Sequence, residues 1–335
     1  MSKILVTGGT GLVGSHLLYH LTKNGVSPIA IKRKDSDIEN VKKVFNYYSN
    51  EHNTLFNQIC WEECDILDII RLNDIVKNVT HIYHAAALIS FNSSLKNKMI
   101  DVNATGTANI IDLSLKHNIK RLCYVSSIAT LGSSQHLSLD ESCLWDWTNQ
   151  SAYAISKHLG EMEVWRGFAE GLSGIIVNPS LIIGPGSWES GIGTIIQKSQ
   201  IGSPFFPHGS CGIIDVNDLT EIMISLMNST ISKERFIINS DHWSYKDLIT
   251  IIAKSLNKKT PYIKAPHWLM KLFIYMDILF HKLKGKTSPL SVDAIKYTTQ
   301  EIVLNTTKIN NTIKHQYRNT EDRLRFCVEM FIKEN

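Results

Sequence analysis

An apolar segment near the start of the chain runs directly into a glycine-rich turn. Residues 4–14 read Ile-Leu-Val-Thr-Gly-Gly-Thr-Gly-Leu-Val-Gly, and an amphipathic helical pattern extends over residues 12–24. Glycines in such a turn let backbone N–H groups approach a pyrophosphate, and the N-terminal end of the following helix carries a partial positive charge. The order of strand, turn and helix therefore predicts a dinucleotide-binding unit.

Short β-branched runs alternate with amphipathic helical patterns over the first 180 residues. The expected strands cover residues 3–7, 28–32, 58–62, 81–86, 121–126 and 174–178. The expected helices cover residues 12–24, 68–77, 95–117 and 151–170. This alternation is typical of a parallel sheet with right-handed crossovers, so we predict an α/β fold with a doubly wound, Rossmann-like sheet.

The alternation ends after Pro179, and a second set of elements follows. Residues 184–212 are rich in Gly, Pro and Ser, which is typical of a binding loop or lid. Beyond them we expect strands at 213–215 and 235–239 and helices at 216–227, 244–256, 266–281 and 320–332, with Ser244 and Thr320 as N-caps. We therefore predict a dinucleotide-binding domain over residues 1–180, rejoined by 213–240, and a smaller α+β substrate lobe over most of 181–335.

The most apolar of these helical segments covers residues 268–280. It is too short to span a bilayer and carries Lys271 and Asp277, so we expect no stable membrane span. Apolar residues occupy most of its circumference, which favours a mostly buried helix. A peripheral contact with a membrane or a partner is the alternative.

The composition is that of an ordinary globular protein and excludes several functional classes. The net charge of +4 is small and dispersed, so we expect no nucleic-acid partner. The six cysteines show no C-x-x-C pair and no zinc spacing, which indicates reduced thiols and predicts no metal site. With no signal peptide before the first strand, we expect a cytoplasmic protein. A small-molecule substrate is expected, and a homodimer is left open.

Two Y-x-x-x-K pairs occur, Tyr19/Lys23 and Tyr153/Lys157. On a helix this spacing places both side chains on one face, where the ammonium favours the phenolate and brings a tyrosine pKa of about 10 towards working pH. The first pair falls on the helix behind the glycine turn, so we interpret it as a chance match. The second follows a strand that delivers Ser126 and Ser127 to the carboxyl edge of the sheet, where open α/β sheets bind ligands.

Taken together, the motifs resemble those of extended short-chain dehydrogenase/reductases, with most similarity to dihydroflavonol-reductase-like members. The resemblance extends over about 180 residues and continues at residues 213–218. It is carried by Thr7–Gly14, His84-Ala85-Ala86-Ala87, Asn103-Ala-Thr-Gly106-Thr107, Ser126-Ser127 with Gly132, Tyr153/Lys157 and Asn178-Pro179-Ser180 with Gly184-Pro185. In such enzymes the serine five residues before that glycine orients the substrate carbonyl, which identifies Ser127. The resemblance implies that Tyr153 transfers the proton and that Lys157 holds the nicotinamide ribose. It also implies that Asn103 supports the lysine through water.

The resemblance also implies a set of cofactor-binding residues. The pyrophosphate is expected on the glycine turn, the adenine beside Asp65 and Ile66, and the nearby ribose at Ala85, Ala86 and Ala87. Pro179 and Ser180 are expected behind the nicotinamide. The residues expected in the glycine turn are Gly8, Thr10, Gly11, Leu12, Val13 and Gly14.

The end of the second expected strand bears on which nicotinamide is used. NAD-dependent members place an acid there to bind the ribose 2′-hydroxyl, whereas this chain has Lys32 followed by Arg33. Arg33 is placed like the phosphate-binding arginine of dihydroflavonol-reductase-like enzymes, and guanidinium matches phosphate by bidentate hydrogen bonding. The sequence therefore favours NADP(H), with NAD(H) as the alternative.

A serine, tyrosine and lysine beside a nicotinamide support reversible hydride transfer at an alcohol or carbonyl carbon. Our first hypothesis is an NADP(H)-dependent oxidoreductase of this kind. A nucleotide-sugar epimerase with retained NAD is the second, and a non-catalytic NAD(P)-sensing protein is the third. Dehydration is disfavoured because Ser127 is followed by Ile128-Ala129-Thr130, without the carboxylate that dehydratases of this fold usually carry.

Overall fold

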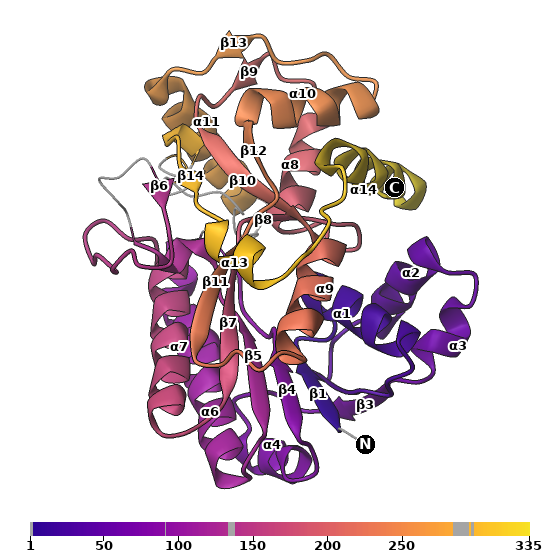
Figure 1. Cartoon of the computed structure of the whole chain (residues 1–335). Helices are drawn as coiled ribbons and strands as arrows, with labels where there is room; N and C mark the ends of the chain where they lie inside the picture. Colours follow the sequence, from indigo (N-terminus) through magenta and orange to yellow (C-terminus); the bar gives the residue numbers. More distant parts are fainter. Residues whose placement is uncertain (1–2, 91, 133–137, 284–294, 296–297) are drawn as a thin grey trace.

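A seven-stranded parallel sheet forms the centre of the larger part of the protein (Figure 1). The computed structural model describes residues 3–90, 92–132, 138–283, 295 and 298–335. The sheet order is β11-β7-β5-β4-β1-β2-β3, with every neighbouring pair parallel. The strands are β1 (Ile4–Thr7), β2 (Ile29–Lys32), β3 (Cys60–Glu63), β4 (His81–His84), β5 (Arg121–Val125), β7 (Gly174–Pro179) and β11 (Glu234–Ile238). The predicted doubly wound fold is confirmed.

Helices cover both faces of the sheet and give it two separate cores. On one face α1 (Leu12–Lys23) and α9 (Val216–Met227) contribute Leu17, Leu18, Leu219 and Met223 to one buried cluster. On the other face α4 (Ile69–Val76), α6 (Gly106–Lys116) and α7 (Ala152–Ala169) form the second cluster with their own apolar side chains. Because both faces are buried, the central strands consist of nearly continuous apolar runs, as expected for a parallel sheet.

The helix predicted over residues 95–117 is interrupted. A 3₁₀ turn at Ser93–Leu95 leads into α5 (Lys96–Ile100), a π-helical turn follows at Asp101–Thr105, and α6 then continues. The π-helical turn contains Asn103. Such turns disturb the regular hydrogen bonding of a helix and re-aim the side chains that they carry.

Two helices between β2 and β3 were missing from the prediction. They are α2 (Ile38–Tyr48) and the short α3 (His52–Phe56). The Asp37 carboxylate caps α2 by accepting hydrogen bonds from the backbone N–H groups of Glu39 and Asn40. The face of α2 that packs inward carries Val41, Val44 and Phe45, a short apolar stripe in an otherwise polar segment.

The C-terminal lobe is built on a three-stranded sheet in the order β12-β10-β8. The strands are β8 (Leu181–Ile183), β10 (Ser210–Asp215) and β12 (Asp241–Ser244), and they pack with α8 (Gly191–Ser199), α10 (Tyr245–Ser255) and α14 (Thr320–Glu334). Residues 184–212 were predicted as a binding loop or lid. In the structure this segment contains α8 and the short strand β9 (Phe205–Phe206). After β10 the chain returns through α9 to β11 at the edge of the large sheet.

The two predicted N-caps had different outcomes. Ser244 caps α10, because its hydroxyl accepts a hydrogen bond from the backbone N–H of Asp247, as predicted. The prediction of Thr320 was wrong by one residue. Asn319 is the cap, with its side chain accepting from Asp322 N–H, and Thr320 is the first residue of α14.

The helix predicted over residues 266–281 forms as α11 (His267–Leu283), but the expectation that it is mostly buried was wrong. Met270 and Ile274 are buried, whereas eight of its other large apolar side chains are exposed. The remaining short elements are β6 (Ser138–Leu139), β13 (Ile263–Lys264), β14 (Val303–Leu304) and α13 (Thr307–Thr312). Within the described part of the chain, the length and apolar character needed to cross a bilayer do not occur together in any helix.

Candidate active site

The glycine turn between β1 and α1 is held against the end of β4. Gly8 has a φ of +69°, and a Cβ at this position would lie 2.6 Å from the backbone nitrogen of Ala86. A Cβ on Gly14 would overlap the carbonyl oxygen of Gly8. These approaches require glycine. Gly11 precedes α1 as its N-cap, and the first turn of the helix contains no acidic residue. Because Gly11 and the first residues of α1 line the cavity described next, the positive end of the helix dipole faces that cavity.

A cavity of about 460 Å³ lies at the carboxyl edge of the large sheet, between the sheet and the C-terminal lobe. It brings together Ser127 from the end of β5 with Tyr153 and Lys157 from α7. Most of the residues predicted to bind the cofactor line the same cavity, namely Gly11, Leu12, Val13, Gly14, Ala85, Ala87, Pro179 and Ser180. Gly8, Thr10 and Ala86 lie beside these residues in the chain but are not part of the lining.

The other predicted cofactor residues lie around the ends of β2 and β3. Arg33 and Asp65 line a second cavity of about 350 Å³. Lys32 is beside it, with its Nζ 4.0 Å from a carboxylate oxygen of Glu63. The side chain of Ile66 is buried in the core and lines neither of these cavities.

Lys157 is the most constrained of the predicted catalytic residues. Its side chain is 1% exposed, and its ammonium donates hydrogen bonds to Tyr124 Oη at 3.0 Å and to the carbonyl oxygen of Val125 at 2.8 Å. Burial lowers the pKa of Lys157 to about 7, although the negative charge of Glu161 acts in the opposite direction. The sequence predicted that Lys157 shares a helix face with Tyr153, but it did not predict that the lysine is buried.

Asn103 is held by backbone and side-chain partners. Its amide donates to Leu88 O at 2.9 Å and to Ser156 Oγ at 2.9 Å, and its Oδ1 accepts from Leu88 N–H at 2.7 Å. These contacts join the π-helical turn to the loop after β4 and to the residue before Lys157. The predicted link from Asn103 to the lysine through water stays a prediction.

Sequence reasoning missed Glu161, which lies one helical turn after Lys157. Its carboxylate is 2% exposed and accepts hydrogen bonds from five side chains that the structure describes. The donors are Ser126, Thr130, Trp165, Asn178 and Arg235. The spacing of four residues between Tyr153, Lys157 and Glu161 indicates that the three share one face of a helix. No signal in the sequence indicated the partner of Glu161, because Arg235 lies 74 residues further along the chain.

Comparison with known proteins agrees with this geometry. The family model of the NAD-dependent epimerase/dehydratase family matches residues 4–235. The chain belongs to this family. As an extended short-chain dehydrogenase/reductase, it is an enzyme that uses NAD(P).

Two curated relatives and one solved structure illustrate the similarity. Sterol demethylase protein B of Methylococcus capsulatus is 23% identical over 272 residues, covering 80% of this chain and 78% of the relative. A putative dihydroflavonol 4-reductase of Synechocystis is 25% identical over 313 residues, covering 90% of this chain and 87% of the relative. The structure of UDP-glucose 4-epimerase from Thermotoga maritima with UDP-glucose superposes with a TM-score of 0.77 at 19% identity, covering 99% of both chains.

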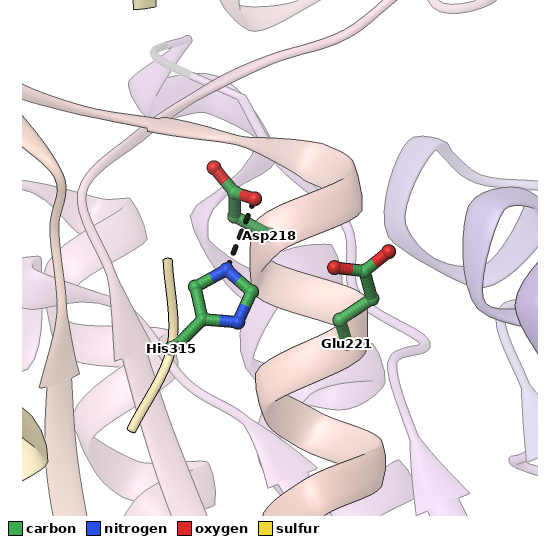
Figure 2. Close-up of side chains that lie close together, drawn as sticks. All are labelled: Asp218, Glu221 and His315. Atoms are coloured by element: carbon green, nitrogen blue, oxygen red, sulfur yellow. Dashed lines mark hydrogen bonds and ion pairs between the residues drawn. The ribbon is translucent and has the colours of Figure 1, made fainter. Parts of the chain in front are cut away.

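One acidic cluster in this family member has the shape of a metal site. Figure 2 shows Asp218 and Glu221 on α9 facing His315, whose Nε2 lies 3.0 Å from Asp218 Oδ1. Arg318 forms ion pairs with both carboxylates. Burial raises the pKa of Asp218, but hydrogen bonds from His315 and Arg318 outweigh it and the net shift is downward. Because the Arg318 guanidinium already pairs with both carboxylates, we interpret the cluster as a structural link between α9 and the segment before α14.

The contacts of Glu161 predict a large effect on stability. Removing one partner of a buried ion pair typically costs about 3–5 kcal/mol because it leaves an uncompensated charge. We expect Glu161→Ala to lower the free energy of unfolding by an amount in this range, since Arg235 and four other donors lose their acceptor, and Glu161→Gln to lower it by less. Denaturant unfolding measures both. The control is Glu163→Ala on the same helix, whose partly exposed ion pair with Arg166 is worth less than about 1 kcal/mol. Equal effects of Glu161→Ala and Glu163→Ala would contradict the prediction.

The buried ammonium of Lys157 predicts a pH dependence of stability. The pKa of Lys157 is about 7 in the folded protein, whereas the pKa of a lysine in an unfolded chain is about 10.4. Between these values the unfolded chain binds the proton and the folded chain does not, so this group makes the folded state more stable as the pH rises.

We expect the unfolding free energy of the cofactor-free protein to rise more steeply between pH 7.5 and 9.5 than that of Lys157→Met. The difference in slope is up to about 1.4 kcal/mol per pH unit. Urea unfolding at several pH values measures it. Lys23→Met, which removes the exposed lysine of the other Y-x-x-x-K pair, serves as the control and should run parallel to the unmodified protein. A parallel profile for Lys157→Met as well would show that Lys157 is not buried as a proton-releasing group.

Proposed function

We propose that this enzyme is an NADP(H)-dependent oxidoreductase that transfers a hydride between the nicotinamide and an alcohol or carbonyl substrate. The observation that carries the proposal is the shared cavity, in which Ser127, Tyr153 and Lys157 lie beside the glycine turn at the sheet edge. Hydride transfer needs a proton donor or acceptor and an oriented substrate oxygen at one place, and these side chains supply both.

The residues around the cavity fit a dinucleotide. The glycine turn and the first turn of α1 present backbone N–H groups to a pyrophosphate, and neither that helical turn nor the described lining of the cavity contains a carboxylate. Ser180 Oγ is buried at the same edge and has no hydrogen-bond partner in the described part of the chain. An unpaired buried hydroxyl at this place is suited to a polar group of a bound ligand. When bound, the nicotinamide supplies or accepts the hydride.

In the proposed mechanism, the chain's own residues handle the oxygen of the substrate. The Ser127 hydroxyl donates a hydrogen bond to the carbonyl oxygen and orients it. The Tyr153 hydroxyl gives that oxygen its proton during reduction and takes it back during oxidation. The positive charge of Lys157, one turn along α7, stabilises the phenolate that remains.

The walls of the cavity favour an apolar substrate. Beyond the predicted catalytic residues the lining is mainly apolar and includes Ile89, Ile128, Leu181, Ile302 and Leu304. Lys157 is the single lysine or arginine among the described residues that line it. A nucleotide sugar carries a diphosphate, which proteins usually bind through arginine or lysine, so the lining supports a carbonyl reductase more than an epimerase.

One observation favours the epimerase alternative. The second cavity, where Arg33 and Lys34 would meet a 2′-phosphate, also contains Asp35, Glu63, Asp65 and Asp68. These carboxylates repel a phosphate and can accept hydrogen bonds from a ribose hydroxyl, which suits NAD. An NAD-retaining nucleotide-sugar epimerase is therefore the second candidate.

Cofactor consumption tests the proposal directly. We expect net oxidation of NADPH when the protein is incubated with a panel of apolar aldehydes and ketones and the absorbance of the cofactor is followed. Loss of a general acid typically costs about 10²- to 10⁴-fold in rate, so Tyr153→Phe should lower turnover by this factor. Tyr19→Phe is the matched control, since the Tyr19 hydroxyl donates to the carbonyl oxygen of Tyr48 at 3.3 Å and does not line the cavity. Interconversion of a nucleotide sugar with tightly retained NAD and no net change in absorbance would establish the epimerase instead.

The position of Arg33 predicts the choice of nicotinamide. We expect the protein to bind NADPH more tightly than NADH and Arg33→Ala to weaken NADPH binding more than NADH binding, because the guanidinium pairs with the 2′-phosphate. A tenfold preference corresponds to about 1.4 kcal/mol. Fluorescence titration of both cofactors measures the preference, with Lys43→Ala, an exposed lysine of α2 outside this cavity, as the control. Tighter binding of NADH by the unmodified protein would overturn the assignment.

A further inference from the structure

The outward face of α11 is an apolar stripe. Trp268, Leu272, Tyr275, Met276, Leu279 and Leu283 are all exposed, between 47% and 78% of each side chain. They recur every three or four residues, which places them on one side of a helix. We refer to these six residues as the α11 stripe.

The opposite face of α11 attaches the helix to the rest of the lobe. Met270 and Ile274 are buried in a small cluster with Ala265, Phe205 and Ile295. Asp277 forms an ion pair with Lys198 of α8 at 3.7 Å. The helix is therefore docked through the side that faces away from the α11 stripe, and its own fold gives no reason for the stripe to be apolar. Half of the exposed large apolar residues of the described chain lie between residues 262 and 283, so the feature is concentrated in one place.

The sequence on both sides of the α11 stripe is strongly basic. Residues 248–292 contain eight lysines and a single acidic residue, Asp277, whose charge is already paired with Lys198. Five of these lysines lie in described segments with exposed side chains, namely Lys254, Lys258, Lys259, Lys264 and Lys271. No ion pair joins any of the five to another residue that the structure describes. Each lysine near a negatively charged lipid surface adds favourable binding energy.

The aromatic residues complete the pattern. Trp268 and Tyr275 of the stripe, together with the 73% exposed Tyr262 just before β13, carry the amphipathic rings that favour the boundary between water and lipid. The helix is 17 residues long and does not qualify as a membrane-spanning segment. An apolar face, flanking lysines and interfacial aromatics on a non-spanning helix are the features of a helix that lies in the plane of a membrane surface.

We propose that α11 docks on the surface of an anionic lipid bilayer, with the α11 stripe inserted among the upper acyl chains and the neighbouring lysines on the headgroups. A second copy of the chain fits this surface less well. In a two-fold interface the same patch meets itself, so the lysines of one copy would face those of the other. A bilayer with acidic headgroups matches both the apolar stripe and the positive charge.

Vesicle flotation of the full chain tests the proposal. We expect the protein to float with vesicles of phosphatidylcholine and phosphatidylserine, to bind vesicles of phosphatidylcholine alone at least tenfold more weakly, and to be released by high salt. Brominated lipids should quench its tryptophan fluorescence, and Trp268→Phe should remove most of that quenching. Vesicle binding that is independent of phosphatidylserine and salt, or absent altogether, would overturn the proposal.

Matched variants separate the α11 stripe from general surface effects. Leu272→Glu with Leu279→Glu should reduce binding at least tenfold, whereas Ile70→Glu with Ile332→Glu, two exposed apolar residues on other helices, should leave it unchanged. Lys264→Glu with Lys271→Glu replaces exposed charges without touching the stripe and should also reduce binding to the acidic vesicles. Circular dichroism and NADPH binding confirm that each variant is folded. Equal binding by the stripe variant would overturn the proposal, as would a dimer in solution that this variant converts to monomer, because the stripe would then join two copies.

Discussion

A buried cation and a buried anion, Lys157 and Glu161, lie one turn apart on α7. Burying either charge alone is costly, and their proximity offsets part of that cost for the lysine, whose pKa Glu161 raises against the effect of burial. Glu161 in turn has a full set of donors. Trp165 lies on α7 itself, and the other four donors come from the segment after β5, from β7 and from β11, so one carboxylate ties α7 to three neighbouring strands. The ends of those strands carry Ser127, Pro179 and Ser180, and the geometry of the cavity therefore depends on this carboxylate.

A second buried chain of hydrogen bonds reaches the glycine turn from the other side. Thr7 Oγ1 at the end of β1 lies 2.6 Å from His84 Nδ1, His84 Nε2 lies 2.9 Å from Thr107 Oγ1, and Thr107 donates to the carbonyl oxygen of Asn103 at 2.7 Å. Burial lowers the pKa of His84 to about 3, with the charge of Lys157 acting in the same direction. The histidine is therefore neutral at physiological pH, one ring nitrogen donating and the other accepting. Together the two networks hold the glycine turn and α7 in one fixed frame.

Local signals were sufficient to predict the larger part of this frame. The expected strands and α1, α4 and α9 each carry an apolar period within a single segment, whereas α7 was predicted from its motif and its Ser151 start, and the bounds of all of them match the structure closely. The prediction failed where the signal depended on distant contacts. The mostly polar segment of α2 packs Val41 and Phe45 into the same core cluster as α1, and Arg235, the partner of Glu161, lies on β11. For α11, a helix that is apolar around most of its circumference gives no period from which the buried side can be identified.

No sequence motif predicts which residues of the C-terminal lobe line the cavity. The cavity wall opposite the glycine turn is formed by Ser210, Cys211 and Gly212 of β10, Tyr245 of α10, and Ile302 and Leu304 near β14. These residues come from segments far apart in the chain, and no short motif joins them. The edge of the cavity at the glycine turn, in contrast, depends on glycines of one short motif, although Gly8 is also required by its close approach to Ala86 of the distant β4 end. A motif therefore identifies the half of the cavity that the resemblance assigns to the cofactor, while the other half is lined by side chains that only the folded lobe brings together. The side chains of that wall are consequently a stronger guide to the substrate than the glycine turn near the start of the chain is.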